Sequence, residues 1–214
     1  MYKKKFIFFV VIILLLSGCT RITNNLDDVV NATMVNNKLS VNTVSTGYEL
    51  YIPTGVKQVV DSQYNQKFKI KNRYIYLYVD TISYYYKNML NYKKDNDYNY
   101  YYKELNFDGK TGYIGINKIE DDLYFCEIIY NYSKVEFYAN LDDLSLIVAN
   151  SLIMQKSIRY NDSLISLELE SDINDGREVT YELDGPKDNK SMFSDYLQEY
   201  VVEEENEVEL PEDN

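Results

Sequence analysis

The chain of 214 residues contains no histidine. This absence removes Ser-His-Asp and Cys-His catalysis, metal sites built on imidazole, and the side chain that most often moves protons near neutral pH. Most hydrolase chemistries are therefore disfavoured. We expect a protein that is not an enzyme, with no catalytic residues, no metal site and no cofactor.

Cysteine is almost as scarce, since the chain has only Cys19 and Cys126. Two cysteines cannot build a disulfide framework. Cys126 shares an expected strand face with Tyr124 and Ile128, whereas Glu127 falls on the opposite face. Without histidine to activate it, Cys126 is expected to pack as a small apolar side chain rather than to act as a reactive thiol.

Basic residues are outnumbered, with 22 Lys and Arg against 34 Asp and Glu, which gives a net charge of −12. A protein this acidic is repelled by the phosphates of nucleic acids and by anionic lipid heads. We therefore expect no nucleic-acid partner. Any affinity for a membrane must come from something other than electrostatic attraction.

The apolar run from Phe6 to Leu16 is too short to cross a bilayer. As a helix it spans about 17 Å at ~1.5 Å per residue, against a hydrocarbon core of ~30 Å. The basic residues Lys3, Lys4 and Lys5 precede it, and the small pair Ser17-Gly18 follows it. This order of a basic cap, a short apolar core and small residues is typical of a signal peptide.

The residues Leu16-Ser17-Gly18-Cys19 resemble the lipobox of bacterial lipoproteins. The resemblance implies that signal peptidase cuts between Gly18 and Cys19, that the Cys19 sulfur carries diacylglyceryl, and that the new amine is acylated as well, for example with palmitate. It also implies that the protein is lipid-anchored at the cell membrane, facing outside the cytoplasm. Two or more long chains make dissociation very slow. The alternative is an ordinary cleaved signal that happens to be followed by cysteine.

Composition divides the rest of the chain. We expect residues 1–18 to be the signal peptide, 19–46 a polar tether, 47–160 the main domain, 161–202 an appendage, and 203–214 an acidic disordered tail. Cleavage would remove three lysines and take the net charge to −15. Within the tether, Asn25 is a suitable cap for a short helix through Leu26, Val29, Val30 and Thr33.

The main domain alternates apolar and polar residues with period two, which predicts strands. The expected strands are one through Tyr48, Leu50 and Ile52, one through Phe68 and Ile70, one from Arg73 to Tyr85, a hairpin over Tyr100–Ile119 turned by Asp108-Gly109, and a pair over Leu123–Ala139. Residues 87–99 lack this alternation and are expected to form a long loop.

From Leu141 to Ile158 the apolar residues change to helical spacing, with Asp142 and Asp143 in the first turn. Strands followed by this helix predict an α+β fold, a single antiparallel sheet with one main helix packed on one face. The opening Gly47-Tyr48-Glu49-Leu50-Tyr51-Ile52-Pro53 and the strand-strand-helix order from Leu123 to Ile158 resemble the PsbP-like fold. That resemblance implies a non-catalytic accessory or binding module.

The appendage is predicted to be a small C-terminal hairpin followed by a helix. Its first strand places Ile165, Leu167 and Leu169 inward, and a turn at Asn174-Asp175-Gly176 leads to a return strand. The amphipathic helix that follows carries its apolar residues at helical spacing: Phe193, Tyr196, Leu197, Tyr200 and Val201.

Tyrosine is abundant, with 24 residues. Tyr74, Tyr76 and Tyr78 alternate with the aliphatic residues of their strand, so they are candidates for an exposed ridge that stacks on a sugar or on a protein partner. The alternative is a cross-strand aromatic ladder that only supports the sheet.

Two motifs imitate ligand sites. Gly109-Lys110-Thr111 lacks the earlier glycine and the following helix of a phosphate-binding loop. The stretch Asp172–Glu182 places Ile173 where a calcium loop needs an oxygen ligand, so it is interpreted as a hairpin turn.

We therefore expect an exported lipoprotein whose domain binds an envelope protein or a glycan. Two alternatives stay open. One is a surface hydrolase that cleaves glycans with two carboxylates drawn from Glu104, Asp108, Asp121 and Asp122. The other is a small solute-binding lipoprotein, which is disfavoured because a single sheet domain lacks two lobes that close on a solute.

Overall fold

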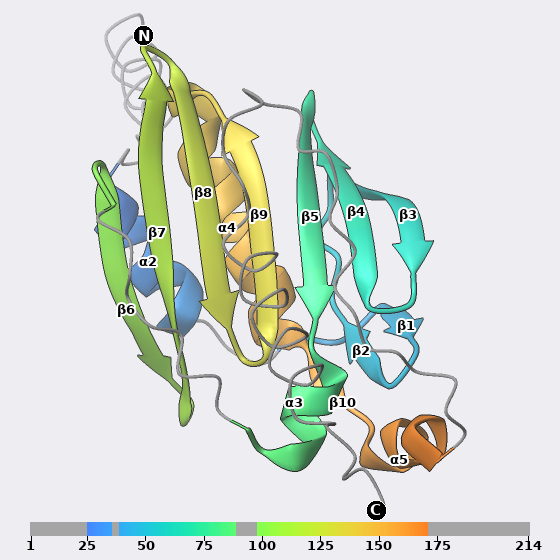
Figure 1. The fold of residues 1–214 in the computed structure, drawn as a ribbon. Helices are drawn as coiled ribbons and strands as arrows, with labels where there is room; N and C mark the ends of the chain where they lie inside the picture. The colour runs from blue at the N-terminus through green and yellow to red at the C-terminus, as the bar shows by residue number, and fades with distance from the viewer. Residues whose placement is uncertain (1–24, 36–38, 89–97, 171–214) are drawn as a thin grey trace, which may run out of the picture.

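The computed structural model describes residues 25–35, 39–88 and 98–170. Figure 1 shows a broad sheet with a long helix behind it and a smaller sheet beside it. No helix in these ranges is long and apolar enough to cross a membrane. The elements follow in the order α2 (Leu26–Val35), β1 (Thr43–Ser45), β2 (Tyr48–Leu50), β3 (Val56–Ser62), β4 (Asn65–Ile70), β5 (Arg73–Val79), α3 (Thr81–Tyr86), β6 (Tyr101–Phe107), β7 (Lys110–Glu120), β8 (Leu123–Tyr130), β9 (Ser133–Ala139), α4 (Leu141–Ser157), β10 (Arg159–Tyr160) and α5 (Asp162–Glu170).

The strands form two antiparallel sheets, which confirms the α+β class and corrects the expectation of a single sheet. Seven strands pair in the order β3-β4-β5-β9-β8-β7-β6, and three short ones in the order β1-β2-β10. The turn at Pro53-Thr54-Gly55 separates β2 from β3 and so divides the chain between the sheets. Strand β3 was not predicted, because it is an edge strand whose residues are mostly exposed and do not alternate.

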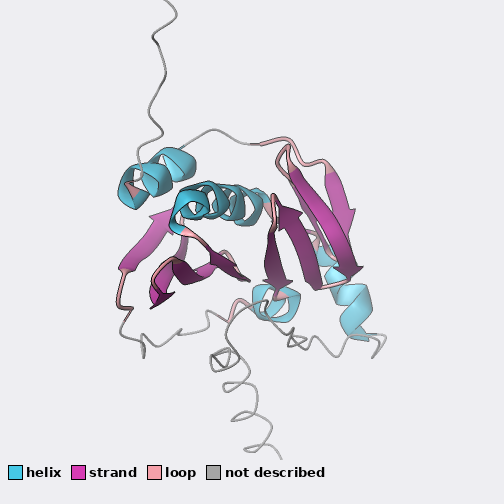
Figure 2. Cartoon of the chain, turned by 90° about the horizontal axis from the view of Figure 1, so that it is seen from above, coloured by secondary structure: helices cyan, strands magenta, loops and turns pink. Residues whose placement is uncertain are grey.

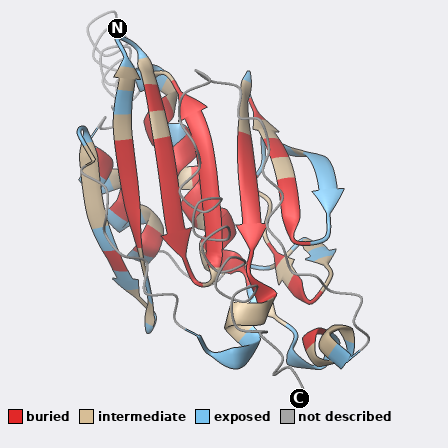
Figure 3. Ribbon diagram, viewed as in Figure 1, coloured by how far each residue is buried: buried red, intermediate tan, exposed pale blue. Residues whose placement is uncertain are grey.

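The core of the large sheet is a row of side chains in register across its strands. Phe68, Ile75, Phe137, Cys126 and Ile116 are successive cross-strand neighbours from β4 to β7. Each is 0 % exposed. Figure 3 shows how burial concentrates in the central strands, with β9 buried along its whole length.

Helix α4 packs on β8 and β9, as predicted for the main helix. Its buried positions include Leu144, Ile147, Val148 and Leu152, at helical spacing. Asp122 lies in the turn between β7 and β8. Its side chain accepts hydrogen bonds from the Leu141 N–H and the Asn140 amide at 3.1 and 2.8 Å. Backbone N–H groups at a helix start need such partners, so the acidic turn holds the beginning of α4.

The short helix expected after Asn25 is confirmed as α2, but it is part of the folded domain. Leu26, Val30 and Met34 are buried, and α2 packs on α4, as Figure 2 shows from above. Tyr101 Oη of strand β6 also donates to Asp27 at 2.9 Å. Residues 26–35, which we had placed in a tether, therefore belong to the domain.

One predicted strand is shorter than expected and leads into a helix, and another is a helix. The strand expected to reach Tyr85 ends at Val79, because the Asp80 side chain accepts a hydrogen bond from the Ser83 N–H at 2.8 Å and starts α3. The strand expected at Ile165, Leu167 and Leu169 is helix α5. Its first turn is closed by a hydrogen bond from the Leu164 N–H to Asn161 Oδ1, and only Ile165 is buried.

Several predictions lie outside the described residues. These are the signal peptide with Cys19, most of the loop expected at 87–99, and everything after residue 170, which includes the return strand, the terminal helix and the acidic tail.

Candidate functional site

A groove of about 440 Å³ lies where the small sheet meets α3 and α5, a region gathered at the lower right of Figure 1. We call it the hairpin groove, because the β1–β2 hairpin forms one wall. It is lined by Val44, Ser45, Tyr48 and Glu49 from the hairpin, Tyr84 from α3, Arg159 and Tyr160 from β10, and Asn161, Asp162, Ser163 and Leu164 at the start of α5.

Strand pairing positions the charged groups of the groove. Arg159 and Glu49 are direct partners in the β10–β2 ladder, and Arg159 Nη1 lies 3.5 Å from Glu49 Oε1. Tyr48 and Leu50 on either side of Glu49 are buried, so alternation along the strand turns Glu49 outward. The Arg159 guanidinium also donates to the Leu39 carbonyl at 3.1 Å. Both charges are therefore paired within the domain.

Gly47 allows α5 to close the other side of the groove. Its φ of +74° is a left-handed conformation that favours glycine. A Cβ on Gly47 would lie 2.9 Å from Cγ1 of Ile165, the buried residue of α5. The Asn161 N–H donates to the Gly47 carbonyl at 2.8 Å. The tight hairpin and the start of α5 thus fix each other.

Two stacked tyrosines form the floor between α3 and β10. The Tyr84 and Tyr160 rings lie 3.8 Å apart at 13°. Tyr160 Oη donates to the Asn131 carbonyl at 2.6 Å, and Lys87 Nζ lies 3.6 Å from the Tyr84 ring centroid. Burial, followed by a hydrogen bond with Asp162, raises the pKa of Tyr84. These contacts hold both rings in place before any ligand arrives.

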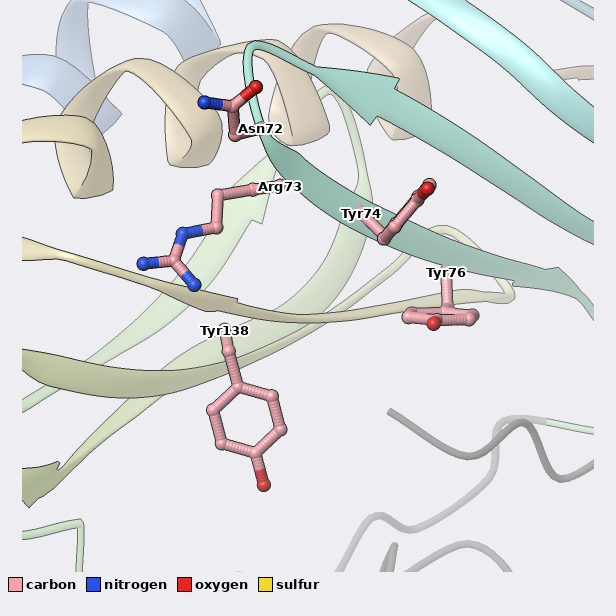
Figure 4. Close-up of a pocket in the computed structure, with 5 residues that line it drawn as sticks. All are labelled: Asn72, Arg73, Tyr74, Tyr76 and Tyr138. Carbon is pink, nitrogen blue, oxygen red and sulfur yellow. The ribbon is translucent and has the colours of Figure 1, made fainter. Parts of the chain in front are cut away.

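The tyrosines predicted as an exposed ridge are less accessible than expected. Tyr76 and Tyr78 are only 6 % and 7 % exposed, and Tyr74 is half-buried. Figure 4 shows Tyr74 and Tyr76 on β5 beside Tyr138 on β9. The cavity between them has a volume of about 30 Å³, which suits a water molecule rather than a ligand. Lys67 Nζ lies 4.0 Å from the Tyr74 ring centroid, so the geometry favours the supporting ladder.

Farther along this face, Glu127 is a buried carboxylate held by tyrosines. Glu127 is 3 % exposed and accepts hydrogen bonds from Tyr113 Oη at 2.6 Å and Tyr98 Oη at 2.9 Å. Its cross-strand partner is Glu136, which is ion-paired with Lys134. Burial, and then the neighbouring Glu136 charge, raises the pKa of Glu127. Gly115 leaves the space for Tyr98, because a Cβ there would lie 2.1 Å from the ring.

A Glu127→Gln variant is expected to become progressively more stable than the wild type as the pH rises. Because the pKa of Glu127 is higher in the folded chain, the folded state loses stability as the pH rises above the ordinary value of 4.5 and through the folded pKa. The glutamine carbonyl can still accept from both tyrosines. Thermal unfolding between about pH 5 and pH 8 measures the difference.

Glu104→Gln on β6 is the matched control for this prediction, because Glu104 is exposed. Its melting temperature is expected to follow that of the wild type at every pH. A wild-type chain that gained stability over Glu127→Gln with rising pH would contradict the argument.

The four acids considered for glycan hydrolysis do not converge. Asp108 lies in the β6–β7 turn, whereas Asp121 and Asp122 lie in the turn at the other end of β7. This strand has 11 residues, which separates the two turns by about 35 Å at ~3.3 Å per residue. Glu104 pairs with Tyr113 in the middle of β6. Because β7 separates Asp108 from Asp121 and Asp122, the four acids do not meet at one site.

Cys126 is 0 % exposed and lies in the core row, with burial raising the pKa of its thiol. This location confirms the expected packing role.

The stretch Gly109-Lys110-Thr111 closes the β6–β7 hairpin, as its interpretation as a turn requires.

Sequence reasoning missed the groove itself. Glu49 appeared only as the polar position of an expected strand, and Asp162 belonged to an expected hairpin. Arg159 follows α4 and pairs with a strand more than a hundred residues earlier. Nothing in the local pattern links these positions.

The chain matches no protein-family model, and a search of curated proteins likewise found no match.

Proposed function

We propose that this protein is an exported bacterial lipoprotein, anchored at the cell membrane through lipid on Cys19 and facing outside the cytoplasm. We further propose that its domain is a non-catalytic binding module of the cell envelope. The anchor rests on the pattern Leu16-Ser17-Gly18-Cys19 after a short apolar run. The binding role rests on the hairpin groove.

The groove supports binding because its walls are fixed and its rim is accessible. The Tyr84 and Tyr160 rings are stacked, and Glu49 is paired with Arg159 across the strand ladder. At the rim, Val44 is 75 % exposed and Leu164 is 44 % exposed. Binding sites that are largely formed in advance lose less conformational entropy when a ligand arrives.

A hydrolase remains the second candidate, because Glu49 and Asp162 both line the groove. Glycan hydrolysis needs two carboxyl groups roughly 5–10 Å apart, one of which holds a proton in an apolar setting. Asp162 is exposed, and Glu49 is ion-paired with Arg159. Neither carboxylate has the surroundings of a general acid, so binding without catalysis is favoured.

Crosslinking in intact cells tests the binding role. A photo-crosslinking amino acid is placed in the full chain at position 44, on the rim of the groove, and irradiated cells are analysed by mass spectrometry. The matched control is position 59 on β3, which is also an exposed valine at 51 % but does not line the groove. We expect a discrete adduct from position 44 that position 59 does not give.

Equal adducts from both positions, or none from position 44 together with no binding of a small molecule, would contradict a binding role for the groove. The anchor is tested separately through Cys19, so the two parts of the proposal can fail independently.

A further inference from the structure

The hairpin groove is lined mainly by polar side chains. Six of its eleven lining residues are Ser, Asn, Asp, Glu or Arg, three are tyrosines that carry a hydroxyl, and only Val44 and Leu164 are aliphatic. Pockets that take apolar ligands are lined predominantly by hydrophobic and aromatic side chains. A lipid or another mainly apolar molecule therefore does not fit this groove.

The charges of the groove do not favour a charged ligand. Arg159 is occupied by the Glu49 carboxylate and by the Leu39 carbonyl. An anion at Arg159 would lie beside the Glu49 carboxylate, which would repel it. The Arg159 guanidinium similarly opposes a cationic ligand. A ligand without charged groups leaves the existing pairs intact.

The remaining groups are suited to hydroxyls. The Ser163 hydroxyl can donate and accept, and the Asn161 side-chain N–H groups can donate. The Ser45 hydroxyl already donates to the Gln63 carbonyl and accepts from Gln66, and Asn161 Oδ1 already accepts from the Leu164 N–H. Paired carboxylates keep lone pairs that can accept from a ligand hydroxyl. Beside these groups, Val44 and Leu164 offer small apolar surfaces that can contact C–H groups. This mixture matches a molecule that alternates hydroxyls with C–H faces.

We propose that the hairpin groove binds a neutral sugar, as a free monosaccharide or as the end residue of a glycan. This inference rests on the proposed binding function and names its ligand class. The volume of about 440 Å³ lies within the range of ~300–1,000 Å³ found for small-molecule sites. The groove is open at its exposed rim, so a sugar that is attached to a longer chain can enter.

The test uses the purified full chain in a detergent without a sugar head group. Saturation-transfer NMR is recorded with glucose, galactose and N-acetylglucosamine, and with a zwitterion, glycine, and an anion, inorganic phosphate, as comparators. At least one sugar is expected to receive saturation from the protein, and neither comparator is expected to displace it.

Two exposed leucines of α5 provide matched variants. Leu164 lines the groove, whereas Leu167, at 61 % exposure, does not. Leu164→Asp replaces an apolar contact with a charge and is expected to weaken sugar binding about tenfold or more. Leu167→Asp is expected to leave the affinity unchanged. Circular dichroism of both variants controls for folding.

The sugar assignment is overturned if no sugar receives saturation, if glycine or phosphate displaces the sugar, or if the two variants have equal affinities. Crosslinking from position 44 separates this failure from failure of the binding function. An adduct with a polypeptide, together with no sugar binding, would retain the groove as a binding site and reject the sugar. The absence of any adduct, together with no sugar binding, would reject both.

Discussion

Replacing Phe137 by alanine is expected to lower the free energy of unfolding by about 3–5 kcal/mol, the range typical of a buried phenylalanine. Phe137 lies on the central strand β9, between Ile75 of β5 and Cys126 of β8. All three are 0 % exposed. The truncation leaves a cavity in the middle of the sheet, where strands paired on both sides cannot easily collapse into it.

Urea unfolding of the full chain at equilibrium measures this loss. Leu146→Ala is the control, since Leu146 lies on α4 but is 40 % exposed. Its truncation should cost far less, because much of the side chain is already in water. A Phe137→Ala chain that lost no more stability than Leu146→Ala would mean that the core row is not tightly packed.

Replacing Cys19 by serine is expected to release the protein from the membrane. Burial of each lipid CH₂ contributes ~0.8 kcal/mol, so two long chains hold a protein firmly, whereas the protein without them has no comparable affinity. The net negative charge also opposes adhesion to anionic lipids. Cell fractionation should find the wild type with membranes and the variant mainly in the soluble fraction.

Cys126→Ala is the matched control, because it removes the only other cysteine. It should remain with the membranes even if it is less stable. Intact mass measurement completes the test, since the wild type should begin at a lipid-modified Cys19. A mature chain that still begins at Met1 with an unmodified thiol, or a Cys19→Ser chain that stays wholly with membranes, would refute the anchor.

The parts of the fold that sequence predicted are those held by local signals. The β6–β7 hairpin follows from alternation around Asp108-Gly109, and both residues have positive φ, of 52° and 72°. Helix α4 follows from apolar spacing and from Asp142 and Asp143 in its first turn. In each case the residues that define the element are neighbours in the chain, so a short window contains the necessary information.

The helix α5 shows where a local signal misleads. Ile165, Leu167 and Leu169 alternate as they would in a strand, yet Leu167 is 61 % exposed. The deciding contacts are with distant residues, because Ile165 packs against Gly47 and Glu168 accepts a hydrogen bond from Tyr64 Oη at 2.5 Å. Such long-range contacts override weak local preferences.

The hairpin groove could not be predicted for the same reason. Its walls come from three parts of the chain, residues 44–49, Tyr84 and residues 159–164, and the first and last of these meet because β10 pairs with β2 in a second sheet. The tyrosine ridge, by contrast, was correctly placed on one strand face, but sequence could not reveal that Tyr76 and Tyr78 are buried. Alternation of residues along a strand predicts which side chains share a face. How exposed that face is depends on the rest of the folded chain.

Because α2 packs on α4, the folded domain includes residues that lie close to Cys19 in the sequence. Only five residues lie between Cys19 and Asn25, the first residue that the structure describes. A lipid on Cys19 would therefore lie at most ~22 Å from Asn25 along the chain. The domain would be confined to a shallow layer beside the bilayer, so any molecule that it captures must itself come close to the membrane surface.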